Sequence, residues 1–185
     1  LNDERNVIPS IHYAKEAGMI AQASLCITHS PIHTVEYYVA LAKKFIEAGA
    51  DEICLKDMAG IGRPETLGKI VAGIKAYKKD IIVQYHSHAG PGFNMASILE
   101  VCKAGCDYVD TGMSPLSWGT GHADIIAVQE MLKDADFKVK DINMAAYMEV
   151  RTQIQEMMDD FLGYYIPKLN HLNNSLLVKP GLPGG

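Results

Sequence analysis

Short apolar runs alternate with amphipathic stretches along the first 140 residues of the chain. Four runs have the composition and length of buried strands, and they cover residues 20–28, 53–56, 81–86 and 108–111. Between these runs, apolar residues recur at every third or fourth position, as they do on one face of a helix. This periodicity predicts helices within residues 34–46, 64–74, 93–102 and 123–132.

A glycine stands just before three of the four predicted strands. The segments 16–19, 47–51 and 103–107 each contain Ala-Gly between a helical pattern and an apolar run. Glycine takes the left-handed conformation at little cost and therefore commonly ends a helix. Thr34 is suited to cap one helix, and Pro64 is suited to begin another. The chain therefore repeats a helix, a tight turn and a strand.

One helix between consecutive strands is typical of a parallel sheet, and the nearly continuous apolar runs indicate strands that are buried on both faces. No Gly-x-Gly-x-x-Gly follows a strand, which disfavours a dinucleotide-binding fold. We therefore predict an α/β fold in which residues 1–140 form part of a (β/α)8 barrel. Because a full barrel needs about 250 residues, we expect the first strand or strands to be missing.

The pattern changes after residue 140. Residues 144–162 have the spacing of an amphipathic helix and no longer alternate with clear strands. We predict that residues 141–185 form a helical extension, in which residues 164–177 begin a mostly helical region that leads to a further domain.

The composition is that of an ordinary globular protein, with 48% hydrophobic and 21% charged residues among 185. The net charge is -5 and the lysines are scattered, which disfavours nucleic acid and anionic membranes as partners. No apolar run approaches the ~20 residues of a membrane span, so we expect no direct membrane insertion. Residues 1–5 resemble neither a signal peptide nor a chain start, and residues 179–185 stop in a turn-rich stretch, so we expect a segment of a longer protein.

The four cysteines form no Cys-x-x-Cys motif, and Cys26 and Cys54 lie in apolar runs. We therefore predict buried free thiols in a reducing compartment. Cys102 and Cys106 could share a helix face, but a zinc site there would need two further ligands that the nearby sequence lacks.

The triplet His86-Ser87-His88 follows the apolar run of residues 81–85 and precedes a loop. Because strand side chains alternate between faces, both imidazoles point the same way. This arrangement is typical of a pair of metal ligands, although two surface histidines would give the same pattern.

In a parallel barrel, catalytic side chains lie at the carboxyl ends of the strands. The polar residues at the predicted strand ends are Thr28, His29, Lys56, Asp57, His86, His88, Asp110 and Thr111, with Thr120 in the following loop. Lys56 would project beside the strand that carries the histidines, since neighbouring strands lie roughly 5 Å apart.

The Lys56 side chain has three possible roles. It could pair with Asp57 or another carboxylate, it could form a Schiff base, or it could react with CO2 and ligate a metal as an anionic carbamate. The two neighbouring histidines favour the carbamate, because a metal cation repels an ammonium group and stabilises a carbamate.

Several segments resemble the carboxyltransferase domain of biotin-dependent enzymes, the family of pyruvate carboxylase, the oxaloacetate decarboxylase alpha subunit and the transcarboxylase 5S subunit. They are residues 51–61 (DEICLKDMAGI), 86–90 (HSHAG), 110–120 (DTGMSPLSWGT) and 183–185 (PGG). Residues 1–6 and 28–34 are most similar to the decarboxylase and transcarboxylase branch. The resemblance covers essentially the whole chain, and Lys-Asp-Met-Ala-Gly followed by His-x-His is a specific combination.

The resemblance implies a role for four residues. Lys56, as a carbamate, matches a metal ligand that is also part of the catalytic apparatus, and His86 and His88 match the two histidine ligands. Thr120 matches the threonine that passes a proton between biotin and the oxo acid. The family's remaining ligand, an Asp, and its substrate-holding Gln and Arg are then expected before Leu1.

The activity that the resemblance implies is metal-dependent carboxyl transfer between biotin and a small 2-oxo acid such as pyruvate or oxaloacetate. The implied cofactors are zinc, cobalt or manganese, together with biotin that is carried on a separate domain or subunit. The implied partners are a biotin carboxyl carrier and further copies of the same chain. The implied location is cytoplasmic, either free or peripheral to a membrane-bound decarboxylase complex.

Two loops depart from the family pattern. Residues 89–92 (AGPG) stand where the family usually has Asp-Thr-Ser-Gly, and residues 121–123 (GHA) stand where it usually has Ser-Gln-Pro. Both loops face the mouth of the barrel, so these departures put the choice of oxo acid or partner in question more than metal ligation.

Two alternatives to the carboxyltransferase remain. One is an aldol-type lyase or synthase of the isopropylmalate synthase-like barrels, which also carry His-x-His but lack the motif around Lys56. The other is an inactive segment whose role is assembly with a biotin carrier.

Overall fold

The computed structural model describes residues 2–161, in which helices and strands alternate as predicted. The helices are α1 (Glu4–Glu16), α2 (Val35–Glu47), α3 (Pro64–Tyr77), α4 (Asn94–Lys103), α5 (Ile125–Asp134) and α6 (Met144–Asp160). The strands are β1 (Gln22–Cys26), β2 (Glu52–Asp57), β3 (Ile82–Ser87) and β4 (Tyr108–Val109). Residues 162–185, including the predicted helical region over 164–177, lie outside the described residues.

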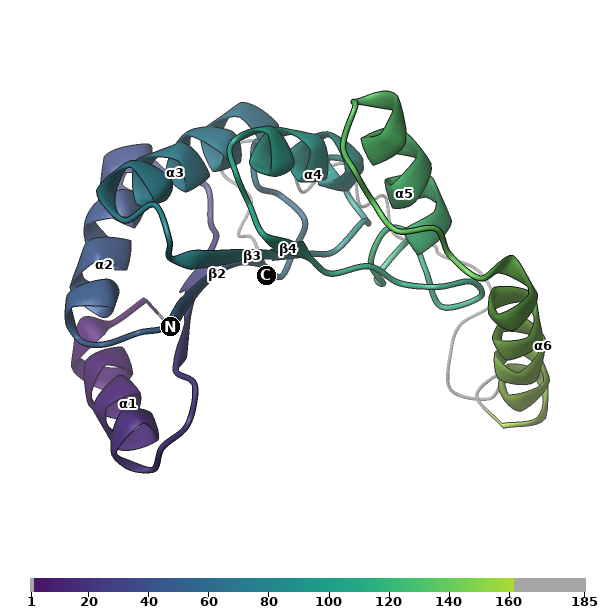
Figure 1. The fold of residues 1–185 in the computed structure, drawn as a ribbon, viewed down its shortest axis with the longest axis horizontal. Helices are drawn as coiled ribbons and strands as arrows, with labels where there is room; N and C mark the ends of the chain where they lie inside the picture. The colour runs from purple at the N-terminus through teal and green to yellow at the C-terminus, as the bar shows by residue number, and fades with distance from the viewer. Residues whose placement is uncertain (1, 162–185) are drawn as a thin grey trace.

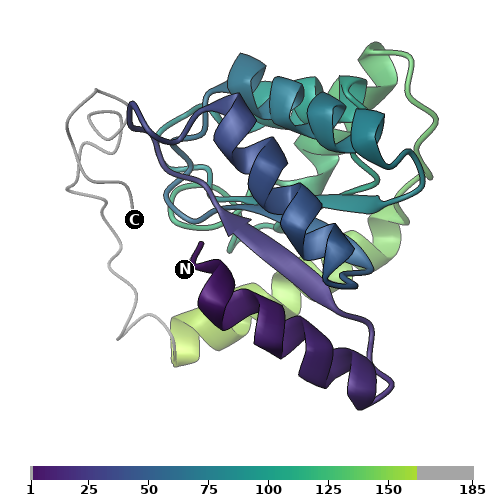
Figure 2. The same ribbon diagram turned by 90° about the vertical axis from the view of Figure 1, so that its left-hand side faces the viewer.

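The strands form one parallel sheet in the order β1-β2-β3-β4. Figure 1 shows this sheet as part of an open arc, with α2, α3 and α4 on its outer side and α1 and α6 at the two ends. In Figure 2, β1 runs between α1 and α2. The arc does not close within residues 2–161, so the prediction of an incomplete (β/α)8 barrel is confirmed.

The two faces of the sheet differ in chemistry. Leu25, Leu55 and Tyr85 are in register on the face that the helices cover, and all three are at most 1% exposed. The opposite face carries a polar row in which the Gln22 side-chain amide donates hydrogen bonds to Glu52 and Gln84, at 2.8 and 2.7 Å. This finding differs from the burial on both faces that the apolar runs predict, because alternate positions of the strands are polar.

The helix ends follow the sequence signals. Gly18, Gly49 and Gly105 all have positive φ, at 73°, 101° and 99°, directly after a helix. The Thr34 side chain accepts a hydrogen bond from the Tyr37 backbone and caps α2. Pro64 begins α3, where its missing N–H costs no helical hydrogen bond. The three glycines thus end their helices shortly before β1, β2 and β4 begin.

The amino-terminal edge of the sheet is held by a contact that occurs twice. Asp51 forms an ion pair with Lys15 of α1 at 2.7 Å, and Asp107 forms one with Lys75 of α3 at 2.6 Å. Each aspartate also accepts a hydrogen bond, at 2.8 Å, from a backbone N–H at or next to the start of the neighbouring strand. We call these two contacts the aspartate latches. Each latch joins a helix to two strands at the edge away from the carboxyl ends.

All four cysteines are free thiols, as predicted. Only Cys54 is buried, however, and the other three are partly exposed. Cys26 is partly exposed because it lies on the face of β1 that turns away from the helices. Cys102 and Cys106 belong to no cluster of possible metal ligands within residues 2–161. No helix in the described part of the chain is long and apolar enough to cross a membrane.

Candidate metal centre

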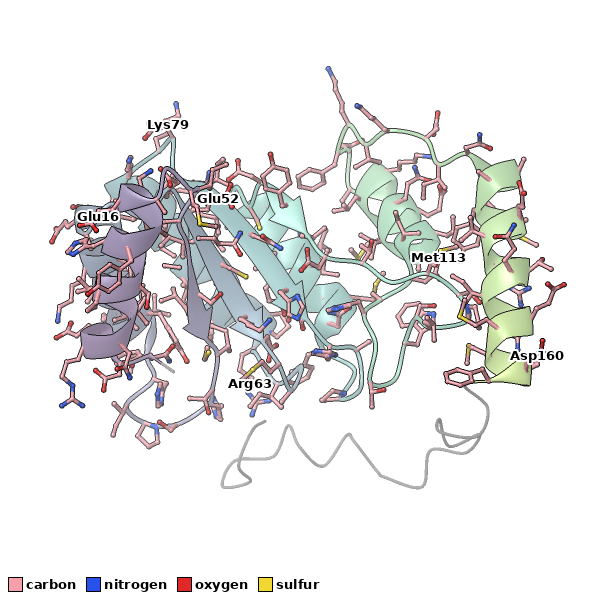
Figure 3. All side chains as sticks on the ribbon, turned by 90° about the horizontal axis from the view of Figure 1, so that it is seen from below. Glu16, Glu52, Arg63, Lys79, Met113 and Asp160 are labelled. Carbon is pink, nitrogen blue, oxygen red and sulfur yellow. The ribbon has the colours of Figure 1, made fainter. Side chains whose placement is uncertain are left out.

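The carboxyl ends of β2 and β3 bring together the lysine and histidines that the sequence singles out. Lys56 is in register with His86, and His88 follows directly after β3. The backbone N–H of His88 donates to the carbonyl of Asp57 at 3.2 Å, which continues the pairing past the end of β3. In Figure 3, Glu52 and Lys79 mark the amino-terminal edge of the sheet and Arg63 marks the edge where these side chains lie.

His86 is fixed by a carboxylate from the segment after β4. Its Nδ1 atom lies 2.6 Å from Oδ2 of Asp110, and Oδ1 of Asp110 accepts a hydrogen bond from Gln84 at 2.8 Å. Burial lowers the pKa of His86, as do the charges of Lys56 and His122, while Asp110 opposes the shift. The imidazole is therefore neutral near pH 7, which is the form that binds a metal.

Lys56 is half-buried, and its ammonium group makes no ion pair with a carboxylate of residues 2–161. Asp57 lies on the opposite face of β2, where it accepts hydrogen bonds from the backbone of Ile61 and Gly62 at 3.0 and 2.9 Å. Burial raises the pKa of Asp57, and these hydrogen bonds oppose the shift. The possible pairing of Lys56 with Asp57 is therefore not observed.

Thr120 reaches the site through its backbone. Its carbonyl oxygen lies 2.5 Å from Nδ1 of His88, and its side chain is in an exposed position. The loop that carries Thr120 is held at its far end by Asp124, which accepts hydrogen bonds from Ser117, Tyr147 and the backbone of Ser114 at 2.8–2.9 Å. The structure thus places Thr120 beside His88, although the two residues are far apart in the sequence.

Sequence reasoning did not place His122 in the site. Its ring centroid lies 4.6 Å from that of His86 and 4.8 Å from that of His88. Together these three histidines form the one group of possible metal ligands found among residues 2–161, with one ligand atom from each within 4.8 Å of the others. The sequence showed that segment 121–123 departs from the family pattern. It did not show that this segment lies close to the end of β3.

Other polar residues at the strand ends lie apart from the histidines. His29 is exposed and belongs to no group of possible ligands in the described part of the chain. The backbone N–H of Thr28 donates to the hydroxyl of Tyr38 at 2.8 Å, which links the segment after β1 to α2. Thr111 lines an apolar pocket of about 490 Å³ near α6 instead.

The chain matches the HMGL-like family over residues 4–156. It is 39% identical to the methylmalonyl-CoA carboxyltransferase 5S subunit of Propionibacterium freudenreichii subsp. shermanii and 32% identical to a pyruvate carboxylase subunit of Methanocaldococcus jannaschii. Both alignments cover all of this chain, which spans about a third of those relatives, 36% and 32% of their lengths.

The fold also matches that of a solved enzyme. A pyruvate carboxylase structure from Rhizobium etli aligns with the whole chain at a TM-score of 0.83 and 24% identity, and the match covers 17% of that protein. At this identity, the likeness concerns the fold. It agrees with the incomplete barrel that the strands form.

Proposed function

The chain belongs to the HMGL-like family, and from this premise we propose that it performs metal-dependent carboxyl transfer between biotin and a 2-oxo acid of the pyruvate or oxaloacetate type. The names of its relatives, a carboxyltransferase subunit and a carboxylase subunit, support this class of reaction. The observation that carries the proposal is the placement of Lys56 in register with His86, with His88 at the same edge of the sheet.

The donor set at this edge fits a divalent transition metal. His86 and His88 each have Nδ1 against an oxygen atom, which leaves Nε2 for a metal. Lys56 has no carboxylate partner among residues 2–161, and its neutral amine can attack CO2 to form an N–C bond and release a proton. The resulting carbamate would supply an anionic oxygen beside the two imidazoles. Zinc, cobalt and manganese all accept such ligands.

A metal held there would supply positive charge near the oxo acid and so stabilise a developing enolate oxygen. The role proposed for Thr120 is proton transfer. The N–C bond of N-carboxybiotin breaks and releases CO2, and the Thr120 hydroxyl gives a proton to the freed biotin nitrogen as it takes one from the methyl group of pyruvate. The enolate carbon of pyruvate then bonds to the CO2 and gives oxaloacetate. A threonine hydroxyl has no useful pKa of its own and therefore acts as a relay. The exposed position of Thr120 leaves its side chain free to meet both reactants.

The same proposal names the partners of the chain. Biotin would arrive on a carrier domain or subunit, and the edge of the sheet where Lys56 and the histidines lie is where it would dock. We further propose a cytoplasmic homo-oligomer, free or peripheral to a membrane-bound decarboxylase complex.

The test is the Lys56→Arg variant of the complete protein, with Lys79→Arg as the control. Arginine keeps the positive charge but forms no carbamate, so we expect loss of metal and of oxaloacetate decarboxylation in the presence of free biotin. Lys79 is exposed at the opposite edge, so its variant should retain both. Labelled 13C-bicarbonate should give a carbamate carbon signal in the wild type that Lys56→Arg lacks. Full metal content and activity in Lys56→Arg would show that the carbamate assignment is wrong.

A further inference from the structure

A third imidazole shares the space between His86 and His88. The rings of His88 and His122 are stacked at 4.8 Å, and the ring of His86 meets both edge-on, at 5.5 and 4.6 Å. All three residues are half-buried, and one possible ligand atom from each lies within 4.8 Å of the other two. Two of them come from β3 and its end, and the third comes from the loop before α5.

The hydrogen bonds orient all three rings in the same way. Nδ1 of His86 meets the Asp110 carboxylate at 2.6 Å, Nδ1 of His88 meets the Thr120 carbonyl at 2.5 Å, and Nδ1 of His122 meets the Ser87 carbonyl at 2.8 Å. A carbonyl oxygen only accepts hydrogen bonds, so the ring nitrogen facing it carries the proton. Nε2 then keeps its lone pair. None of the three Nε2 atoms has a hydrogen-bond partner within residues 2–161. An oxygen acceptor on one ring nitrogen is the usual support of a histidine that ligates a metal through the other.

The loop holds His122 in place and is itself hydrogen-bonded to the segment after β3. The carbonyl of His122 accepts a hydrogen bond from the backbone of Trp118 at 2.7 Å, and the carbonyl of Gly121 accepts one from Ala89 at 2.9 Å. A Cβ atom on Gly121 would lie 2.3 Å from the carbonyl oxygen of Leu116, so this close turn requires glycine. The position of His122 is therefore set by its surroundings before any metal binds, and such pre-organisation favours metal binding.

We propose that His122 is a third imidazole ligand of the metal ion at this edge, so that residues 2–161 supply three nitrogen donors. This inference rests on the proposed function, whose metal ligands are His86, His88 and the Lys56 carbamate. It assigns a role to the segment 121–123, which departs from the family pattern. A third imidazole favours zinc or cobalt over manganese, because manganese prefers oxygen ligands.

The test compares His122→Asn with His33→Asn in the full chain. Asparagine keeps an N–H group near the position of Nδ1, so the hydrogen bond to Ser87 can be retained while Nε2 is lost. His33 also has Nδ1 in a hydrogen bond, 2.7 Å from the Ser30 hydroxyl, but lies outside the histidine group. The probe is Co2+ added to metal-free protein, with affinity measured by competition with a coloured chelator and coordination read from the visible absorption of the ion.

We expect His122→Asn to bind Co2+ about tenfold or more weakly, to change its visible spectrum and to lose preference for Co2+ over Mn2+. His33→Asn should match the wild type. Wild-type affinity and spectrum in His122→Asn, with binding lost in His86→Asn, would overturn the inference and leave the proposed function standing. Unchanged binding in both variants would overturn the inference together with the proposed metal site.

A measurement on the wild type covers the case in which His122→Asn does not fold. Long-range 1H–15N spectra of histidine rings report each Nε2 atom separately. Addition of Zn2+ should shift the Nε2 signals of His86, His88 and His122 together, with that of His33 unchanged. A shift confined to His86 and His88 would overturn the inference.

Discussion

Nδ1 of His86 lies 2.6 Å from Oδ2 of Asp110, and this contact joins the end of β3 to the segment that follows β4. The carboxylate holds the ring in one orientation and makes Nε2 a better electron donor. Gln84 steadies the same carboxylate through its other oxygen, at 2.8 Å. Asp110 is thus a positioning residue for the proposed metal ligand His86.

We predict that Asp110→Asn weakens zinc binding about 10- to 100-fold, the usual cost of losing an outer-shell carboxylate. The reason is that an amide accepts the His86 proton more weakly and no longer orients the ring through a charge. Zinc affinity is measured by chelator competition. Asp136→Asn is the matched control, because Asp136 is exposed and its positive φ of 64° suits asparagine. Equal affinities in the two variants would assign Asp110 a purely structural role.

Gly60 supports the backbone of His88. It has φ of +66°, and a Cβ atom there would lie 2.1 Å from the carbonyl oxygen of His88. Gly60→Ala is therefore expected to lower the free energy of unfolding by about 2–5 kcal/mol, from the left-handed conformation and the backbone clash together. Urea titration measures the loss.

Gly92→Ala separates the two causes of that loss. Gly92 also has positive φ, at 96°, but a Cβ atom there would meet no other atom within 4 Å. Its alanine variant should lose only about 1–2 kcal/mol. If both alanine variants lose the same amount, the close approach to His88 contributes nothing.

Asp124 anchors the loop that carries Thr120 and His122. Burial alone would raise the pKa of Asp124, but hydrogen bonds from Ser117, Ile126, Tyr147 and Ser114 together lower it below its ordinary value. A carboxyl group with a lowered pKa stabilises the folded state at neutral pH, and this contribution is lost as the pH falls through its folded pKa.

Asp124→Asn should therefore lower the free energy of unfolding by about 1–3 kcal/mol at pH 7. Both carboxylate oxygens of Asp124 accept hydrogen bonds, whereas an amide has only one acceptor oxygen. The difference from the wild type should shrink when the pH is lowered towards 3. Urea titrations at the two pH values measure this change. Tyr147→Phe removes a single donor, at 2.9 Å, and should cost less at pH 7. A difference that does not depend on pH would contradict the ionised state of Asp124.

The thiols of Cys54 and Cys106 should react slowly with iodoacetamide. Burial raises the pKa of Cys54 to about 11 and that of Cys106 to about 12, so little thiolate exists at pH 8. We expect native alkylation of Cys54 to be roughly 100-fold slower than in the unfolded chain and to rise about tenfold per pH unit. Mass spectrometry of labelled peptides follows each site. A rate in the native protein equal to that in the unfolded chain would mean that Cys54 is accessible and unshifted.

Local signals made most of the fold predictable. Gly49 and Gly105 end helices through a property of glycine itself, and Thr34 caps α2 with its own side chain. The neighbouring placement of Lys56 and His86 also follows from local information, because strands of one parallel sheet end at a common edge. Each of these predictions needs only the local pattern of single helices and strands, together with the rule that parallel strands end at a common edge.

The place of His122 could not be predicted in the same way. Its position depends on how the loop before α5 folds back, and that path is fixed by Asp124 and by the bond between Gly121 and Ala89. The sequence showed Asp110 as a polar residue at the end of a predicted strand. It did not show that Asp110 would contact the ring of His86. Irregular loops carry no periodicity from which their path could be read.

The aspartate latches lie at the edge of the sheet opposite the histidines, so these supports of the scaffold and the proposed metal ligands are different residues. A substitution in the loops after the strands leaves Lys15, Asp51, Lys75 and Asp107 intact. Loop positions other than anchors such as Gly60 and Asp124 can therefore change while the latches keep the opposite edge of the sheet in place. In evolutionary terms, the two edges of this sheet are free to change at different rates.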